Sequence, residues 1–418
     1  MTTPDASVAV QPGTLVHREQ LNPAARVACV LCGAPALPEQ PYWGCQVCGQ
    51  QAPLAVVYPP LPATGLSSTA AVAMARSAYA LFADQVDAAP VGAPTPLTHA
   101  PSFGSHVHLK QETFSRTHSH KDRYQAVAAR MARLAGCRGV VASSTGNHGA
   151  SAAAHATAAG LRSVVFCHPE APEGLLRAIG AFGGVVAQLP VAEQRAALIE
   201  LVREGWFPAT SLDPVLSGAA NPFAAEGYKA VAWEIVEQLG ELPVAVFIPT
   251  AGGDTFYGIA KGLAEVALLA GVAMPRVYAI QPVGANALSQ SVAAGRQITL
   301  DAPSSIALSI ADAQSGRHAL AALAAWNGHV LDVSEGAIRT AIIDLAQAGI
   351  YTDPASAAAL AGYRQAVAER HIDEEATAVL LLTSSGFKWP GALEAVFPVW
   401  SAHSQDELWR ELAARRDS

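Results

Sequence analysis

Residues 109–123 read LKQETFSRTHSHKDR, and residues 140–150 read VVASSTGNHGA. In the second stretch an apolar run ends in small polar residues and glycine, and an Ala-rich segment follows. This order predicts a strand, a tight turn and a helix. Backbone N–H groups at the start of such a helix can bind an anion. In the first stretch, residues 107–110 are predicted to form a strand that leads to the segment around Lys121.

The same alternation continues on both sides of these stretches. Helix and strand patterns follow one another from Lys121 to about residue 189. A buried-type strand at 244–249 precedes a glycine-containing turn at 250–255, and a strand at 378–382 ends in Thr383. Strands that alternate with helices predict parallel sheets covered by helices, an α/β fold.

The composition argues against two classes of protein. The chain has 418 residues, enough for two or three domains, and 51% of them are hydrophobic. No apolar run approaches the roughly 20 residues that cross a bilayer, and the N-terminus lacks a signal-peptide pattern. A formal net charge of -8 argues against a nucleic-acid partner. We therefore expect a cytoplasmic protein that binds neither membranes nor nucleic acid.

Four of the six cysteines form two closely spaced pairs, each followed by glycine. They are Cys29, Cys32, Cys45 and Cys48, in the pattern C-x2-C then C-x2-C. Paired thiolates from two such turns can complete a tetrahedral zinc site, so residues 21–55 are predicted to form a zinc ribbon. Four unrelated thiols are the alternative. Residues 1–20 are expected to be a flexible tail.

The two stretches together resemble the pyridoxal-phosphate (PLP) enzymes of fold type II, the tryptophan-synthase-beta family, and most of all its threonine synthases. The pattern of threonine synthases has Glu, then Asn-Pro-Thr-Gly-Ser-Phe-Lys-Asp-Arg, and later a Ser-Thr-Gly-Asn turn. This chain keeps Glu112, Thr117, Ser119, Lys121, Asp122 and Arg123 in register. It departs from the pattern at Ser115, Arg116, His118 and His120. Further matches extend from the cysteine pairs to Lys388.

The resemblance implies an architecture for the whole chain. Residues 56–418 would form a fold type II catalytic region, with a smaller mobile subdomain at about 121–205 inserted in a larger one. Many threonine synthases begin with a similar ribbon, so residues 21–55 are expected to hold a structural zinc ion. Enzymes of this family are commonly dimers, and a homodimer is expected for this chain as well.

The resemblance also assigns the residues that hold PLP. Lys121, one of five lysines in the chain, matches the lysine that binds PLP covalently and moves protons. Asn147 matches the residue that faces the 3′-oxygen of the ring, although an Asn helix cap fits the same position. Thr383 matches the hydroxyl at the pyridine nitrogen, with Ser384 as the alternative. The phosphate would be held by Gly252, Gly253, Asp254 and Thr255.

Asp254 is an unusual residue for a phosphate-binding turn. A carboxylate about 4 Å from one unit of negative charge costs roughly 4 kcal/mol at an effective dielectric near 20. We therefore expect the Asp254 side chain to point away from the phosphate or to pair with a base.

The substrate site is predicted on both sides of the lysine. The residues expected to bind the amino-acid substrate are Ser144, Thr145, Gly146, His148, Thr117, Ser119 and His120. His118, His120 and His148 replace residues typical of threonine synthases, and Arg116 replaces a proline. We hypothesise that the leaving-group site is altered. Either the phosphate of O-phospho-L-homoserine fits poorly, or it relies on Arg116 and a protonated histidine in place of the usual contacts. Histidines that merely line a wet cleft are the alternative.

These residues predict PLP-dependent elimination or replacement on an amino acid. The first candidate is the threonine synthase reaction, a carbon–oxygen lyase reaction that converts O-phospho-L-homoserine and water to L-threonine and phosphate. Ser/Thr dehydratases and diaminopropionate ammonia-lyases, which have His at the position of His148, are alternatives, as is phosphoserine-dependent β-replacement of the cysteate synthase type. A catalytically silent amino-acid-binding homologue is a rival of another class, but such a protein would not need Lys121.

Overall fold

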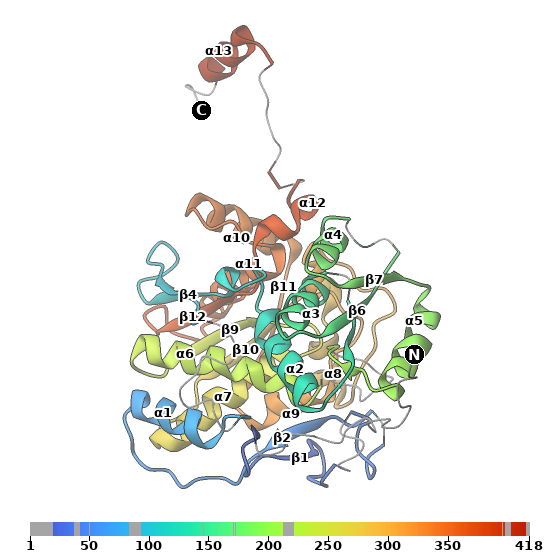
Figure 1. The fold of residues 1–418 in the computed structure, drawn as a ribbon. Coiled ribbons are helices and arrows are strands. Elements are labelled where there is room, and N and C mark those ends of the chain that lie inside the picture. The colour runs from blue at the N-terminus through green and yellow to red at the C-terminus, as the bar shows by residue number, and fades with distance from the viewer. Residues whose placement is uncertain are drawn as a thin grey trace, which may run out of the picture.

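The computed structural model describes residues 20–36, 42–49, 51–82, 93–144, 146–169, 171, 173–211, 221–394, 396–397 and 403–414. Two of its three sheets are large and parallel or nearly so, and the third is a small antiparallel sheet near the N-terminus (Figure 1). The flexible tail predicted for residues 1–20 lies, except for Gln20, outside the described residues.

The largest sheet has six strands in the order β11, β10, β9, β12, β4, β3. Their bounds are β3 (Leu97–His99), β4 (Val107–Gln111), β9 (Ala245–Pro249), β10 (Arg276–Pro282), β11 (Gly328–Val333) and β12 (Ala378–Leu382). Every neighbouring pair is parallel except β3 and β4, which are antiparallel. The predicted parallel sheet is therefore mixed at one edge.

Two layers of helices cover the faces of this sheet. On β12, Val379 and Leu381 face one hydrophobic core, whereas Ala378, Leu380 and Leu382 face the other, and all five are fully buried. Residues of α1 (Ser68–Ala78), α6 (Lys229–Leu239) and α7 (Asp254–Ala270) fill the first core, and residues of α10 (Glu335–Gln347) and α11 (Pro354–Ala368) fill the second. A strand buried on both faces is a continuous apolar run, as this one is.

The second sheet is wholly parallel and has the order β7, β6, β5, β8. Its strands are β5 (Gly139–Ser143), β6 (Arg162–Cys167), β7 (Val185–Gln188) and β8 (Phe207–Pro208), and the helices around it are α2 (Lys121–Leu134), α3 (Asn147–Ala158), α4 (Glu173–Ala181) and α5 (Val191–Arg203). Val165 packs with α3 and α4 on one face, and Phe166 packs with α5 on the other. The sheet lies beside the larger one (Figure 1).

The remaining helices connect these layers or end the chain. They are α8 (Ala287–Ala294), α9 (Arg317–Ala325), α12 (Pro390–Leu393) and α13 (Gln405–Ala414), with short 3-10 helices η2 (Glu112–Phe114), η3 (Ala224–Tyr228), η4 (Val283–Ala285), η5 (Leu308–Ile310) and η6 (Gly386–Lys388). Within the described part of the chain, none of the helices has the length and apolar character needed to cross a membrane.

The small antiparallel sheet pairs β1 (Arg26–Cys29) with β2 (Leu54–Val57). Its second strand is anchored to the body formed by the six-stranded sheet and its helices, because Nζ of Lys261 on α7 donates to the Val56 carbonyl at 2.6 Å. The segment between β1 and β2 contacts the second body, which is formed by the four-stranded sheet and its helices. The Tyr42 ring lies 5.3 Å from the Phe207 ring, and Trp43 packs against the core beside α5. The N-terminal region thus touches both large bodies.

Candidate active site

A cavity of about 700 Å³ lies where the carboxyl ends of strands from both large sheets meet. Residues at the end of β5, after β9 and after β12 all line it, and so does Lys121 at the start of α2. In open α/β sheets, ligands bind at the carboxyl ends of the strands. The residues predicted to hold a cofactor, Lys121, Asn147, Gly252, Gly253, Asp254, Thr255 and Thr383, all line this cavity.

The amine of Lys121 is free to react. Within the described residues, its Nζ has no hydrogen bond or ion pair. Burial lowers the pKa of this amine, although the nearby carboxylates of Asp254 and Asp312 oppose the shift. A lysine must be neutral to attack a carbonyl, and a desolvated lysine reaches that state more easily.

The other four lysines of the chain are bound elsewhere. Lys110 is buried in the core, where its Nζ lies 2.6 Å from Glu234. Nζ of Lys229 lies 2.9 Å from Glu265, Lys261 pairs with Glu226, and Nζ of Lys388 donates to the Thr117 carbonyl at 2.6 Å. Geometry therefore favours Lys121 as the residue that holds PLP, which remains a prediction.

The turn between β9 and α7 is shaped for an anion. Gly253 has φ +104°, and a Cβ there would lie 2.4 Å from the Cβ of Ala319, so only glycine fits. The Gly252 carbonyl accepts a hydrogen bond from the Gly316 N–H at 2.7 Å, which holds the turn in place. The N-terminus of α7, at Asp254, faces the cavity, where its N–H groups and helix dipole favour a phosphate.

Asp254 has the basic partner that the sequence led us to expect. Its Oδ1 lies 2.8 Å from Nε2 of His318, and both side chains are buried. Burial alone would raise the pKa of Asp254, but the contact with His318 and the charge of Lys121 outweigh it and lower the pKa. Sequence reasoning could not find His318, because no local pattern links it to Asp254.

The hydroxyl of Thr383 ends a chain of hydrogen bonds. Its Oγ1 lies 3.0 Å from Oγ of Ser356, which donates to Asp353 at 2.6 Å. Burial raises the pKa of Asp353 to about 6, although bonds from Ser356 oppose this shift. Ser384, the alternative to Thr383, instead accepts a hydrogen bond from Nδ2 of Asn147 at 2.9 Å.

The turn between β5 and α3 lines the other side of the cavity. Oγ of Ser144 accepts hydrogen bonds from the N–H groups of Gly146 and Gly149 at 3.1 and 2.9 Å. Asn147 begins α3, and its buried Oδ1 has no partner among the described residues. Thr145 lies outside the described residues. Ser144, Gly146, Asn147 and His148 line the cavity.

Two of the three histidines singled out in the sequence line the cavity. Nε2 of His148 lies 2.7 Å from both the Ala209 carbonyl and Nε2 of Gln125, and its buried Nδ1 has no partner among the described residues. Burial and the charge of Lys121 lower the pKa of His148 to about 4. The same causes lower the pKa of His120, whose Nδ1 lies 3.0 Å from the Thr383 carbonyl. Both shifts disfavour the protonated histidine that we had hypothesised.

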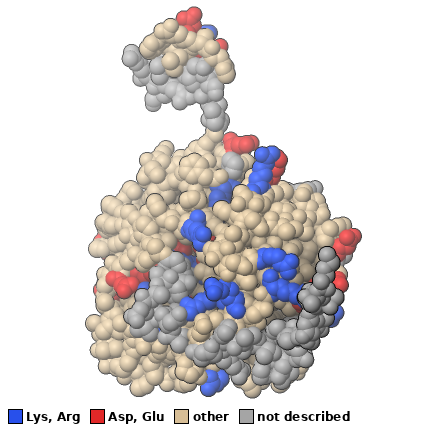
Figure 2. Space-filling model, in the orientation of Figure 1, with Lys and Arg blue, Asp and Glu red and all other residues tan. Residues whose placement is uncertain are grey.

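Arg116 and His118 are not among the described residues that line the cavity, so the structure does not bring them to the predicted leaving-group site. Nδ1 of His118 lies 3.1 Å from the Thr113 carbonyl, and the side chain is exposed. Arg116 lines a separate hollow of about 860 Å³, together with Arg130 and Arg133 of α2. Figure 2 shows basic side chains gathered over the middle of the face of the molecule that is seen in Figure 1.

Thr117 and Ser119, predicted to bind substrate, are buried below the start of α2. Oγ1 of Thr117 donates to Asp122 at 2.8 Å, and the Lys121 N–H donates weakly to Oγ of Ser119 at 3.4 Å. Neither belongs to the described cavity lining. Their side chains therefore shape the turn that presents Lys121 and do not face the cavity.

The cavity fits PLP. It combines a free amine, a glycine turn at a helix N-terminus, a neutral hydroxyl and an Asn side chain with an orphaned oxygen. Sequence reasoning missed several residues of its wall, among them Asp312, Arg195 and Gln51. These three come from segments without a recognisable motif, so only the three-dimensional arrangement could reveal them.

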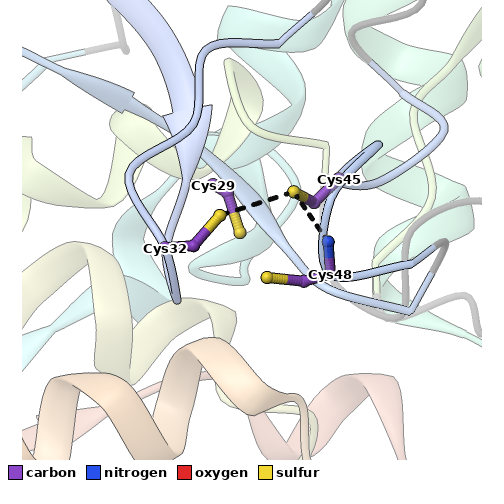
Figure 3. A group of neighbouring side chains, drawn as sticks. All are labelled: Cys29, Cys32, Cys45 and Cys48. Carbon is purple, nitrogen blue, oxygen red and sulfur yellow. Dashed lines mark hydrogen bonds between the residues drawn. The ribbon is translucent and has the colours of Figure 1, made fainter.

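The four paired cysteines form one cluster in space, and their thiols converge from two turns (Figure 3). Their sulfur atoms all lie within 4.8 Å of one another, and Sγ of Cys32 is 3.7 Å from Sγ of Cys45. Tetrahedral zinc with Zn–S bonds of about 2.3 Å places sulfurs about 3.8 Å apart. In both turns the glycine N–H donates to the carbonyl of the first cysteine, from Gly33 at 2.9 Å and Gly49 at 3.0 Å.

A family model described as "Pyridoxal-phosphate dependent enzyme" matches residues 88–384. The chain therefore belongs to this family of PLP-dependent enzymes, whose chemistry is of the lyase type. The match covers both large sheets and the whole lining described from Lys121 to Thr383, and it leaves out the cysteine cluster.

Among its relatives is the threonine synthase of Halalkalibacterium halodurans, 30% identical over 71% of this chain and 82% of the relative. The biosynthetic L-threonine dehydratase of Mycobacterium leprae is 31% identical over 71% of this chain and 69% of the relative. The structure of threonine deaminase isoform 2 from Solanum lycopersicum superposes with a TM-score of 0.64 at 20% identity, covering 81% of this chain and 97% of that one. The fold is thus that of fold type II PLP enzymes, and the function is threonine synthase-like or threonine dehydratase-like.

Proposed function

We propose that this protein catalyses PLP-dependent elimination from an amino acid, with or without addition of water, and that Lys121 holds the cofactor. The observation that carries the proposal is the free Nζ of Lys121 in a cavity that also holds the glycine turn at 252–253 and the Thr383 hydroxyl. Each of the other lysines is engaged in a hydrogen bond or ion pair.

PLP, when bound, supplies an electron sink that makes the Cα proton of an amino acid acidic. The amine of Lys121, whose pKa is lowered by burial, is placed to accept that proton. N–H groups at the start of α7 hold the phosphate, and those at the start of α3 hold the substrate carboxylate. Thr383 offers the ring a neutral hydroxyl and not a carboxylate, which suits elimination better than transamination.

The first candidate reaction is that of threonine synthase, from O-phospho-L-homoserine and water to L-threonine and phosphate. The curated relatives at 30% identity support it. Dehydration of serine or threonine is the second candidate. His148 favours it, because Ser/Thr dehydratases have a histidine at this position, where threonine synthases usually have a threonine.

A substrate panel tests the proposal. Purified holoenzyme is given O-phospho-L-homoserine, L-serine, L-threonine, L-2,3-diaminopropionate and O-phospho-L-serine, and release of phosphate, ammonia and oxo acid is scored separately. We expect release from at least one substrate and none from Lys121→Ala. An enzyme that retains PLP and releases nothing from any of the five would contradict the proposal.

We further propose that the cysteine cluster binds one zinc ion and forms a zinc ribbon. The spacing of the four sulfurs supports this site. Metal analysis of freshly purified protein should find one zinc per chain, and Cys48→Ser should lower this content and the melting temperature, because a ribbon of this size depends on its metal. Cys137→Ser, outside the cluster, should retain the zinc. Purified protein without zinc would contradict the site.

Two proposals at a larger scale rest on the family resemblance. Residues 121–205, which include α2 to α5 and most of the smaller sheet, would move as a unit over the substrate, and the chain would be a homodimer. Hydrogen exchange with and without substrate analogue tests the first proposal, and the molar mass in solution tests the second.

A further inference from the structure

A second carboxyl group faces the cavity besides that of Asp254. Asp312 follows η5, lines the cavity with Lys121, and leaves its side chain exposed to the cavity. The backbone N–H of Gly252 donates a hydrogen bond to its carboxylate. Asp254 has His318 as a partner, but Asp312 has no ion pair among the described residues.

The fixed charges of the cavity leave little room for another anion. Apart from histidines, its charged lining residues are Lys121 and Arg195 against Asp254 and Asp312. The phosphate of PLP and the carboxylate of the substrate would add negative charge, and covalent attachment would occupy the Lys121 amine. Among the described lining residues, apart from histidines, Arg195 would then be the one cation left to balance a phosphate on the substrate.

Asp312 can only interact favourably with a group that donates hydrogen bonds. A carboxylate has acceptor oxygens alone, and it repels a phosphate ester at close range. A hydroxyl donates to it, and an ammonium forms a charge-assisted hydrogen bond that is shorter and stronger. Asp312 thus places a carboxylate acceptor in the cavity that also holds Lys121.

We propose that Asp312 is a specificity residue that accepts a hydrogen bond from the leaving group, and that the substrate is an amino acid with a hydroxyl or ammonium leaving group. This inference rests on the proposed elimination. Among the candidate substrates it favours those with a hydroxyl or ammonium leaving group over O-phospho-L-homoserine. A substrate whose leaving group cannot donate a hydrogen bond leaves the Asp312 carboxylate unpaired. The enzyme therefore prefers substrates whose leaving group can donate one.

Matched substrates test the inference on the holoenzyme. L-Serine, L-2,3-diaminopropionate and O-phospho-L-serine differ only at the leaving group. We expect kcat/KM of the wild type to favour either of the first two over the phosphate ester by about 100-fold or more, or 2.8 kcal/mol. Asp312→Asn should narrow this preference at least about tenfold, chiefly through KM, and Asp312→Glu should retain it. Asp301→Asn, an exposed carboxylate outside the described lining, is the control.

A binding measurement separates this inference from the proposed function. L-Norvaline and L-2-amino-4-phosphonobutyrate cannot eliminate, and their affinities follow from changes in the visible absorbance of the cofactor. Asp312→Asn should strengthen binding of the phosphonate about tenfold and leave norvaline unchanged. Unchanged phosphonate affinity, or faster wild-type turnover of O-phospho-L-serine than of L-serine, overturns the role of Asp312. If no substrate of the panel is turned over, the proposed elimination is overturned. The affinities for norvaline and the phosphonate still test the role of Asp312 in that case.

Discussion

At the scale of single residues, the site is defined by which polar groups lack partners. Four lysines are held by carboxylates or carbonyls, whereas the amine of Lys121, Oδ1 of Asn147 and Nδ1 of His148 have no partner in the described part of the chain. Buried polar atoms are normally hydrogen-bonded, so unsatisfied ones mark places where a ligand completes the structure. All three of these residues line one cavity.

Lys121 is expected to be the attachment site of PLP. Borohydride reduction of the yellow enzyme followed by peptide mapping should label the peptide that contains Lys121, because its amine alone is free in the described structure. Lys121→Ala should lose the label and the visible absorbance of covalently bound PLP. Lys110→Met is expected to destabilise the fold and keep the label. A label on Lys229 or Lys388 would overturn the assignment.

His148 is expected to make stability depend on pH. Its pKa is about 4 in the folded protein against 6.5 for free imidazole, so the unfolded chain binds more protons between these values. Stability therefore falls as pH falls through that window, by about 2 kcal/mol between pH 6.5 and pH 5 for one group. Urea unfolding at several pH values should show a shallower dependence for His148→Gln than for wild type. The exposed His403→Gln is the control, and equal slopes for His148→Gln and wild type would refute the prediction.

At the scale of elements, α2 carries the reactive lysine because a buried ionic network fixes its first turn. Nε of Arg123 lies 2.8 Å from Glu112 after β4, and Nη1 lies 2.6 Å from Glu234 on α6. Lys110 of β4 also contacts Glu234 at 2.6 Å. Two cations thus face two carboxylates in the core, and three elements are held at one point beside Lys121.

Replacing Arg123 by Gln should cost about 3–5 kcal/mol of unfolding free energy, because Glu112 and part of Glu234 would lose their partner in the core. Guanidinium unfolding of the two proteins measures this difference. Arg133→Gln, on the exposed side of the same helix, should change the value by about 0.5 kcal/mol or less. A cost below about 1 kcal/mol for Arg123→Gln would mean that the network does not hold α2.

Helices and strands could be predicted from the sequence more reliably than the contacts that each side chain makes. The strand and helix on either side of the turn at 144–146 follow from local patterning, and the structure has them as β5 and α3. The glycine turn before α7 was predicted in the same way. By contrast, Thr117 and Ser119 face the protein interior, and Asp312 faces the cavity, because of contacts between segments far apart in the chain. Local periodicity contains no information on such contacts.

At the scale of the whole molecule, the N-terminal region is part of the catalytic body and not an appendage. The hydroxyl of Tyr58 donates to Glu226 at 2.9 Å, and the Val56 carbonyl accepts from Lys261 at 2.6 Å. Glu226 and Lys261 belong to a buried group of charges that includes Lys229. These contacts lie directly after residue 55, where we expected the ribbon to end, and they tie β2 to the larger sheet and its helices.

A chain that starts at residue 59 should be far less stable than one that starts at residue 20. The shorter chain lacks Val56 and Tyr58, so Lys261 and Glu226 lose hydrogen bonds in the core, and the apolar surface under β2 becomes exposed. We expect insoluble protein or a melting temperature lower by several degrees. Expression and thermal unfolding of both chains measure this difference. Equal melting temperatures would show that the N-terminal region is dispensable for the fold.

The position of β12 determines when this enzyme can be completed during its own synthesis. Ala378 pairs with Val107 of β4 on one side and with Ala245 of β9 on the other, so the last strand made is inserted between two made long before. Until residues 378–382 leave the ribosome, the edges of β4 and β9 stay open, and open edges invite wrong pairing. Thr383 and Lys121 line the same cavity only after β12 has been inserted. A nascent chain stalled before β12 would therefore hold its cysteine turns and its reactive lysine, yet have no cavity in which to use them.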